Sequence, residues 1–212
     1  MIRIFIESGV GAAKDKNKET TNEEDFVVKF IEHHFKEMVY KTDFDVFGIG
    51  GYTKLINIQP LLEDKTDNDI NIVIFDADDA YNGGGYKIRY QELLNVQNQM
   101  KVEFDLFLWP NNHDDGDFES LLELMINSEH QGMLDCYDGF EKCVGGRDSK
   151  GVLYKLPGRK AKMYTYISIM NLSKTERDKL SKGYYLFEDE RYWNLDAPAI
   201  KPLKDFLKQY CR

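Results

Sequence analysis

The sequence is poor in the residues that mark several classes of protein. Its three cysteines, Cys136, Cys143 and Cys211, form no CxxC pair and have no histidine cluster near them, which argues against a disulfide framework and a cysteine-based zinc site. No apolar run approaches the roughly 18 residues of a membrane span, and the run in the N-terminal MIRIFIE is too short for a signal peptide. We therefore expect a cytoplasmic protein with no membrane contact.

Positive charge is also scarce. The chain has 28 Lys and Arg against 37 Asp and Glu, a net charge of −9, so it lacks the basic footprint of a protein that coats nucleic acid. The one basic patch is residues 146–162, GRDSKGVLYKLPGRKAK. Within it, Arg159, Lys160 and Lys162 at a helix start are candidates for phosphate contact. The alternative is a solvated loop.

What is present is a repeated alternation of strand and helix patterns. At 212 residues the chain suits one domain, which we place at 1–212, with a core over about 1–126 and a mostly helical extension over 127–212. The alternation predicts an α/β fold of three layers, α/β/α, with a mainly parallel, Rossmann-like sheet. The predicted strands are residues 2–6, 45–49, 70–76 and 103–109, and the predicted helices begin near residues 21, 53, 86, 118, 136, 159 and 202.

Acidic residues end two of these strands. The stretch INIVIFDADDA runs from buried apolar residues into Asp76 and Asp78, and the first strand ends in Glu7. In open α/β sheets the ligand lies beyond the carboxyl ends of the strands. Carboxylates that cluster there repel one another, and a hard divalent cation is the commonest partner that relieves this repulsion. Glu7, Asp76 and Asp78 are therefore predicted as catalytic residues that bind Mg²⁺ or Mn²⁺. The alternative is that the aspartates cap a turn or the next helix.

Other polar and aromatic groups carry weaker predictions. Asp117 and Glu119 are possible additional ligands, although acids at a helix start also suit the helix dipole. His33 and His34 have no partner at metal-ligand spacing in the sequence and are expected to be structural. An aromatic cluster is expected to pack in the core, with stacking on bases as the alternative. It comprises Tyr184, Tyr185, Tyr192 and Trp193.

The segments IFIES, VFGIGGYTKL and VIFDADDA, in this order, resemble the Toprim domain. The segment GDFESLLELMI is similar to one in small Toprim-like proteins related to the overcoming-lysogenization-defect (OLD) nucleases. The resemblance implies that Glu7 is the general acid or base and that Asp76 and Asp78 bind Mg²⁺. The Toprim pattern usually has a compact E-G-x-x-D/E turn after the glutamate. The loop is longer in this chain, so whether residues 22–25 present the next acid stays open.

Three functions remain open from the sequence. The resemblance implies metal-dependent phosphoryl transfer or phosphodiester hydrolysis on DNA or RNA. A second candidate uses the D-x-D motif as a phosphatase nucleophile or to hold a nucleotide sugar, but Ala80 stands where the phosphatase pattern wants Thr or Val. The third is a non-catalytic module that binds nucleic acid or a partner protein. Whether the chain is an enzyme is therefore not decided by its sequence.

Overall fold

The fold is built on a four-stranded sheet in which every strand pair is parallel. The computed structural model describes residues 1–9, 18–147, 154 and 156–211. The strands lie in the order β2-β1-β3-β4, so β1 and β3 are central. The register of β1 with its neighbours is given by the partners of Ile2, which are Phe44 in β2 and Ile70 in β3. The strands are β1 (Ile2–Ile6), β2 (Phe44–Gly48), β3 (Ile70–Asp76) and β4 (Asp105–Trp109).

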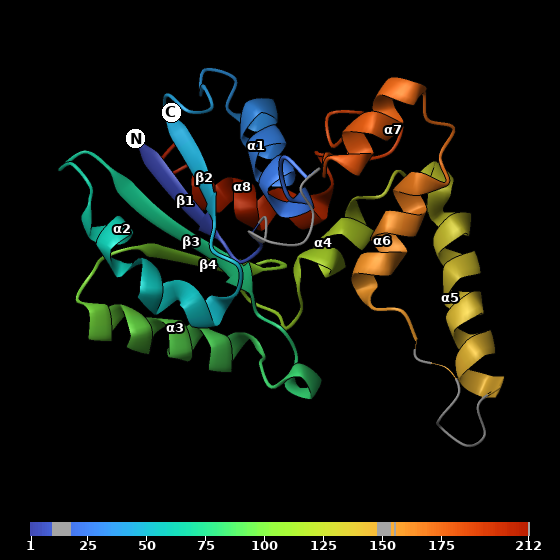
Figure 1. The fold of residues 1–212 in the computed structure, drawn as a ribbon, viewed down its shortest axis with the longest axis horizontal. Helices are drawn as coiled ribbons and strands as arrows, with labels where there is room; N and C mark the ends of the chain where they lie inside the picture. Colours follow the sequence, from blue (N-terminus) through green and yellow to red (C-terminus); the bar gives the residue numbers. More distant parts are fainter. Residues whose placement is uncertain (10–17, 148–153, 155, 212) are drawn as a thin grey trace.

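Helices cover both faces of this sheet (Figure 1). Because strand side chains alternate, Ile72 and Ile74 of β3 enter one core, while Val73 and Phe75 enter the other. The first core is covered by α1 (Asn22–His34) and α8 (Lys201–Leu207). The second is covered by the 3-10 helix η1 (Tyr52–Ile58), α2 (Gln59–Glu63) and α3 (Tyr86–Met100). The predicted α/β fold, with a parallel sheet between two helical layers, is confirmed.

Between β4 and α8 the chain is largely helical, and its helices stand beside the sheet (Figure 1). The helix predicted from residue 159 forms as α6, whereas α7, with a capping box of Ser173 and Glu176, was not predicted. Most of this part joins the first core. The remaining elements are η2 (Ala80–Asn82), α4 (Phe118–Met125), η3 (Ser128–His130), α5 (Gln131–Arg147), α6 (Arg159–Ser168), α7 (Lys174–Ser181) and η4 (Pro198–Ile200).

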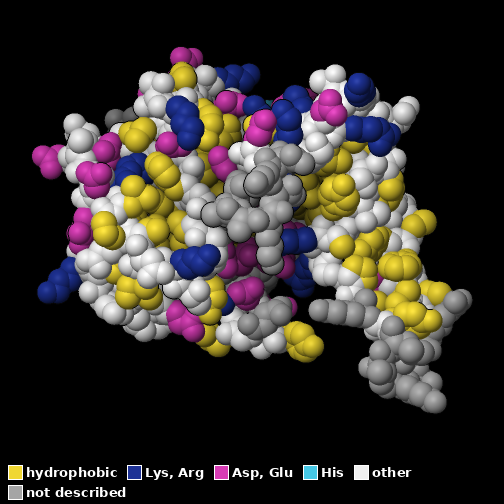
Figure 2. Space-filling view, in the orientation of Figure 1, with side chains coloured by type: hydrophobic (Ala, Val, Ile, Leu, Met, Phe, Trp, Pro, Cys, Tyr) yellow, Lys and Arg dark blue, Asp and Glu magenta, His cyan; other side chains and the backbone are white. Residues whose placement is uncertain are grey.

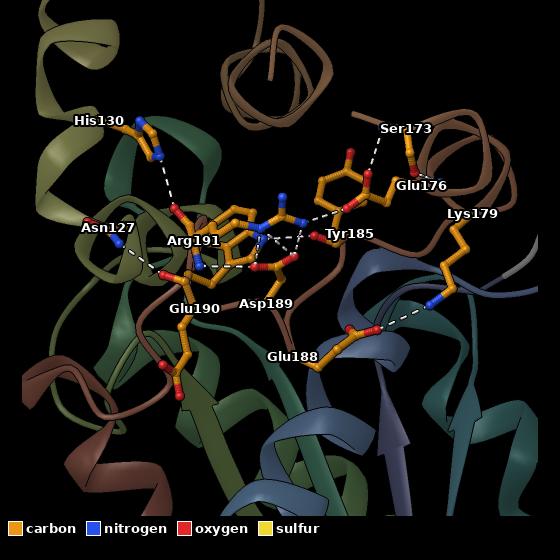
Figure 3. A network of polar contacts seen from close by, with 11 residues as sticks. Asn127, His130, Ser173, Glu176, Lys179, Tyr185, Glu188, Asp189, Glu190 and Arg191 are labelled. Carbon is orange, nitrogen blue, oxygen red and sulfur yellow. Dashed lines mark hydrogen bonds and ion pairs between the residues drawn. The ribbon is translucent and has the colours of Figure 1, made fainter. Parts of the chain in front are cut away.

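The segment between α7 and η4 has no regular structure but is held by polar contacts (Figure 3). The Arg191 guanidinium donates to Glu176 at 2.6 Å, and the Trp193 indole donates to the carbonyl of Tyr185 at 2.8 Å. The carbonyl of Tyr192 accepts a hydrogen bond from the Tyr166 hydroxyl at 2.6 Å. Of the four aromatic residues expected to pack in the core, Tyr192 and Trp193 are buried in the first core and Tyr185 is partly buried against it, whereas Tyr184 is partly exposed and not part of that core.

Two exclusions made from the sequence can be compared with the structure. Cys136 and Cys143 are exposed free thiols, and Cys211 is a buried one. Over the described part of the chain, no helix is both long enough and apolar enough to cross a membrane.

Candidate metal centre

The strand order creates a crevice between the carboxyl ends of β1 and β3. The chain leaves β1 toward β2 on one side and leaves β3 toward β4 on the other, so the connections diverge at this point. Glu7 follows β1 directly, and Asp76 is the last residue of β3. The Glu7 carboxylate accepts the backbone N–H of Asp76 and that of Tyr52, each at 3.3 Å. Such a divergence point is where α/β sheets bind ligands.

A cavity of about 310 Å³ opens at this crevice. Two further acids reach it from helix starts: Glu23 from the first turn of α1 and Glu119 from the first turn of α4. In the space-filling view, acidic side chains gather in a hollow between the sheet and the helices beside it (Figure 2). The lining residues are Glu7, Ser8, Gly9, Asn22, Glu23, Gly50, Gly51, Asp76, Phe118, Glu119 and Lys160.

Glu23 belongs to residues 22–25, for which the sequence left open whether they present a further acid, and in the structure it lines the cavity. Its carboxylate is buried, accepting the Trp109 indole N–H at 2.8 Å and the Ser8 backbone N–H at 3.0 Å. Burial raises the pKa of Glu23 to about 7, although both hydrogen bonds favour the charged form. The available signal was its place in the first turn behind the Thr21 N-cap, because the helix after β1 begins over the crevice.

The other acids of the cavity hold their protons more tightly than usual. Burial is the main cause at Asp76, and repulsion from Glu23 and Glu7 adds to it, so the pKa of Asp76 lies well above its ordinary value. Burial likewise raises the pKa of Glu7 and of Glu119. The raised pKa values show that the carboxylates of the cavity are not fully compensated by positive charge.

Among the described residues that line this cavity, Lys160, near the start of α6, is the basic one. Desolvation of its ammonium lowers the pKa of Lys160, but attraction to Glu119, Asp76 and the other acids of the cavity outweighs this and raises it. The side chain remains exposed. Of the three predicted phosphate contacts, Lys160 is therefore the one that faces the cavity.

Asp78 lies close to the cavity but is not among its lining residues. It has a left-handed backbone, with φ +58°, and its carboxylate accepts the Arg89 guanidinium at 2.7 Å. Arg89 also stacks on Tyr52, at 3.4 Å from the ring centre. The spacing of Asp76 and Asp78 predicted that both side chains point toward the same metal ion. The chain turns after Ala77, however, and this turn directs Asp78 to the ion pair with Arg89.

The remaining predicted residues are engaged within the chain. Asp117 is the N-cap of α4 and accepts the Arg159 guanidinium at 2.9 Å. Lys162 pairs with Glu123 at 3.0 Å and with Asp138 at 2.7 Å. Residues 148–153 and 155 of the predicted basic patch lie outside the described residues.

The donor set of the cavity suits a hard cation. All four acidic side chains offer oxygen, the ligand that Mg²⁺ and Mn²⁺ prefer. Among the described residues, these acids do not bring three carboxylate oxygens within 4.8 Å of one another. Mg²⁺ does not need that arrangement, because it keeps several waters and binds through one or two carboxylates together with substrate phosphates.

Comparison with known proteins places the chain in a family. Residues 19–212 match the family described as "Protein of unknown function (DUF3226)". The chain belongs to this family. The matched region of the DUF3226 chain includes Glu23, Asp76, Glu119 and Lys160, whereas Glu7 precedes it. No curated protein and no solved structure match the chain.

Proposed function

We propose that the chain catalyses Mg²⁺- or Mn²⁺-dependent phosphodiester hydrolysis or phosphoryl transfer on nucleic acid. The observation that supports this most directly is the convergence of Glu7, Glu23, Asp76 and Glu119 at the point where the sheet connections diverge. The resemblance to Toprim proteins, which assigns roles to Glu7 and Asp76 and also to Asp78 outside the cavity lining, supports the choice of substrate.

Glu7 and Asp76 would hold the ion, because they flank the gap between β1 and β3. A bound ion would neutralise charge that develops on a phosphoryl group and activate a water. Glu23, with a pKa near 7, is suited to exchange a proton at neutral pH. The Ser8 and Trp109 N–H groups fix the position of its carboxylate for that role.

Lys160 supplies the contact to the substrate phosphate. Lys160 lines the acidic cavity and belongs to α6. The helical part of the chain therefore adds a cation to a site whose acids come from the ends of β1 and β3 and from the starts of α1 and α4. A substrate phosphate would be attracted by this charge and by the ion together.

The test is a cleavage assay on single- and double-stranded DNA and RNA with Mg²⁺, Mn²⁺ or EDTA. Asp76→Asn keeps the acceptor for the Phe118 N–H, which now bonds at 2.8 Å, and removes one charge from the cavity. We expect metal-dependent cleavage to fall by about 100-fold or more. The matched control is Asp114→Asn, which removes an exposed carboxylate outside the cavity and should retain wild-type cleavage.

Calorimetry with Mg²⁺ and Mn²⁺ separates metal binding from catalysis. We expect binding by the wild-type chain and by Asp114→Asn, and weaker binding by Asp76→Asn. The proposal is refuted if no substrate is cut with either metal, or if Asp76→Asn cleaves as fast as the wild type. Binding of nucleic acid in EDTA without cleavage in Mn²⁺ would instead identify the non-catalytic module.

A further inference from the structure

A second group of metal-ligating side chains lies at the other end of α1. His33 and His34 form the last turn of this helix, and Asp196 lies in the segment before η4. The Nε2 atom of His33 is 3.1 Å from one Asp196 oxygen, and the Nδ1 atom of His34 is 3.9 Å from the other. One donor atom from each residue lies within 4.8 Å of the other two. Spacing along the chain does not indicate this cluster, because the carboxylate partner of the two histidines lies more than 160 residues away.

The hydrogen bond on the far side of His34 fixes which nitrogen is available. Its Nε2 atom lies 2.8 Å from the carbonyl oxygen of Leu195, which can only accept, so Nε2 carries the proton. In the neutral ring, Nδ1 then holds a free lone pair directed at the Asp196 side. A backbone carbonyl behind a ligating imidazole is the usual support for a metal ligand.

The backbone on both sides of the cluster is held in place. On the α1 side, Phe30 and Ile31 are fully buried in the first core. On the other side, Trp193 is buried, and the Asp196 N–H donates to the Asn194 side chain at 2.9 Å. The preceding residues are fixed by the polar network of Figure 3, in which Asn127 and His130 donate to the carbonyls of Glu190 and Arg191. Little ordering is therefore needed for three ligands to close on an ion.

We propose that His33, His34 and Asp196 bind a first-row transition-metal ion, Zn²⁺ in the first instance, at a site separate from the acidic cavity. Two imidazoles and a carboxylate suit Zn²⁺, whereas Mg²⁺ prefers oxygen alone. Donors at tetrahedral positions around Zn²⁺ are about 3.4 Å apart. The 3.1 Å from His33 and the 3.9 Å from His34 are to different Asp196 oxygens, and one donor atom from each residue lies within 4.8 Å of the other two, so the side chains would close slightly on a bound ion.

The fourth coordination position is available to water or a small ligand. His33 and Asp196 also line a cavity of about 520 Å³, which extends along Ile126, Asn127 and Trp193. Both side chains are accessible, with exposed fractions of 34% for His33 and 69% for Asp196, so an ion can reach them. The bound ion would add metal bonds between the end of α1 and the segment before η4, two parts that already contact each other through the His33–Asp196 and His34–Leu195 hydrogen bonds.

The experiment titrates metal-free full-length chain with Zn²⁺ by calorimetry and with Co²⁺ as an absorbance probe. We expect one Zn²⁺ site per chain that persists in Asp76→Asn, and a tetrahedral Co²⁺ spectrum. His33→Gln and Asp196→Asn should each weaken Zn²⁺ binding by at least about 100-fold. Both positions are accessible, so these variants are expected to fold, and circular dichroism will establish that they do.

The matched control is His113→Gln. His113 is an exposed histidine whose Nδ1 lies 2.6 Å from Asp114, so it offers the same atom types without a third ligand. It should leave the titration unchanged. The proposal fails if the wild-type chain shows no Zn²⁺ binding below 1 mM, about the weakest affinity of a specific site, or if His33→Gln binds as the wild type does. Loss of binding in His113→Gln alone would assign the ion to an adventitious surface pair.

Discussion

Buried carboxylates are the residues that set this protein apart at the smallest scale. Glu23 and Asp25 lie two positions apart in the first turn of α1, and both are buried. Glu23 faces the cavity, whereas Asp25 faces away and accepts the Tyr185 N–H at 2.9 Å. Burial raises the pKa of each to about 7. These residues therefore couple the folding of α1 to pH.

Replacing Asp25 should change how stability depends on pH. The folded protein keeps the Asp25 proton up to a pKa of about 7, while the unfolded chain releases it near 3.8. Between these values the folded state binds more protons, so stability falls as the pH rises. Asp25→Asn removes this loss while keeping an acceptor for Tyr185. We expect the free energy of unfolding of the variant to exceed that of the wild type by about 2–4 kcal/mol at pH 8 and to equal it near pH 4, as measured by urea unfolding.

The control for this prediction is Glu37→Gln, which alters an exposed carboxylate just beyond the same helix. Its unfolding curves should follow the wild type at each pH. Some pH dependence will remain in Asp25→Asn, because Glu23 acts in the same sense. Equal stability of Asp25→Asn and the wild type at pH 8 would contradict the argument.

At the scale of elements, the site is assembled from helix starts. The first turns of α1, α4 and α6 supply Glu23, Glu119 and Lys160, and the strand ends supply Glu7 and Asp76. The N-terminus of a helix is positive, so it lessens the cost of placing carboxylates close together. The caps that begin α1 and α4 therefore determine where two of the acids stand.

The N-cap of α1 can be tested against that of α7. Thr21 accepts the Glu24 N–H at 3.1 Å and bonds to Ser8, the residue after Glu7, whereas Ser173 accepts the Glu176 N–H at 3.3 Å far from the cavity. Thr21→Ala and Ser173→Ala should each lose about 1 kcal/mol of stability. Only Thr21→Ala should also lower cleavage, by about 10- to 100-fold, because it shifts Glu23.

Denaturant unfolding and the cleavage assay, applied to both variants, give the comparison. Equal loss of cleavage in the two would mean that stability alone governs the activity. Unchanged cleavage in Thr21→Ala would mean that the position of Glu23 does not matter to the chemistry.

At the scale of the whole molecule, the proposed function requires an acidic chain to attract an acidic substrate. The net charge is −9, and Lys160 faces several carboxylates across the cavity. Nucleic acid therefore meets repulsion unless a cation occupies the site. In this respect the protein differs from one that binds nucleic acid through a basic surface.

Metal removal should accordingly weaken nucleic-acid binding itself. We expect affinity for a labelled oligonucleotide to fall about tenfold or more when EDTA replaces Mg²⁺ at constant ionic strength, since like charges left facing each other cost at least about 1.4 kcal/mol. Fluorescence anisotropy at low temperature measures this, with added KCl as the control for ionic strength. Undiminished affinity in EDTA would show that binding does not depend on the metal.

Local patterns alone determined much of the fold. The apolar runs of residues 2–6 and 70–76 form β1 and β3, and the period from Tyr86 to Met100 forms α3, because strand and helix formation depends on neighbours within a few residues. The helix predicted to begin near residue 118 forms as α4, with Asp117 as its N-cap. The proximity of Glu7 and Asp76 could also be predicted, because parallel strands bring their carboxyl ends to the same edge of the sheet.

Only the tertiary structure decided which groups meet. The strand order places a crevice between β1 and β3. Asp78 forms an ion pair with Arg89 instead of lining the cavity. The packing of α1 and α6 brings Glu23 and Lys160 to the cavity. The pairing of His33 with Asp196 spans 163 residues. Contacts of this range depend on how whole elements pack, and the periodicity of a single segment carries no information about its distant partner.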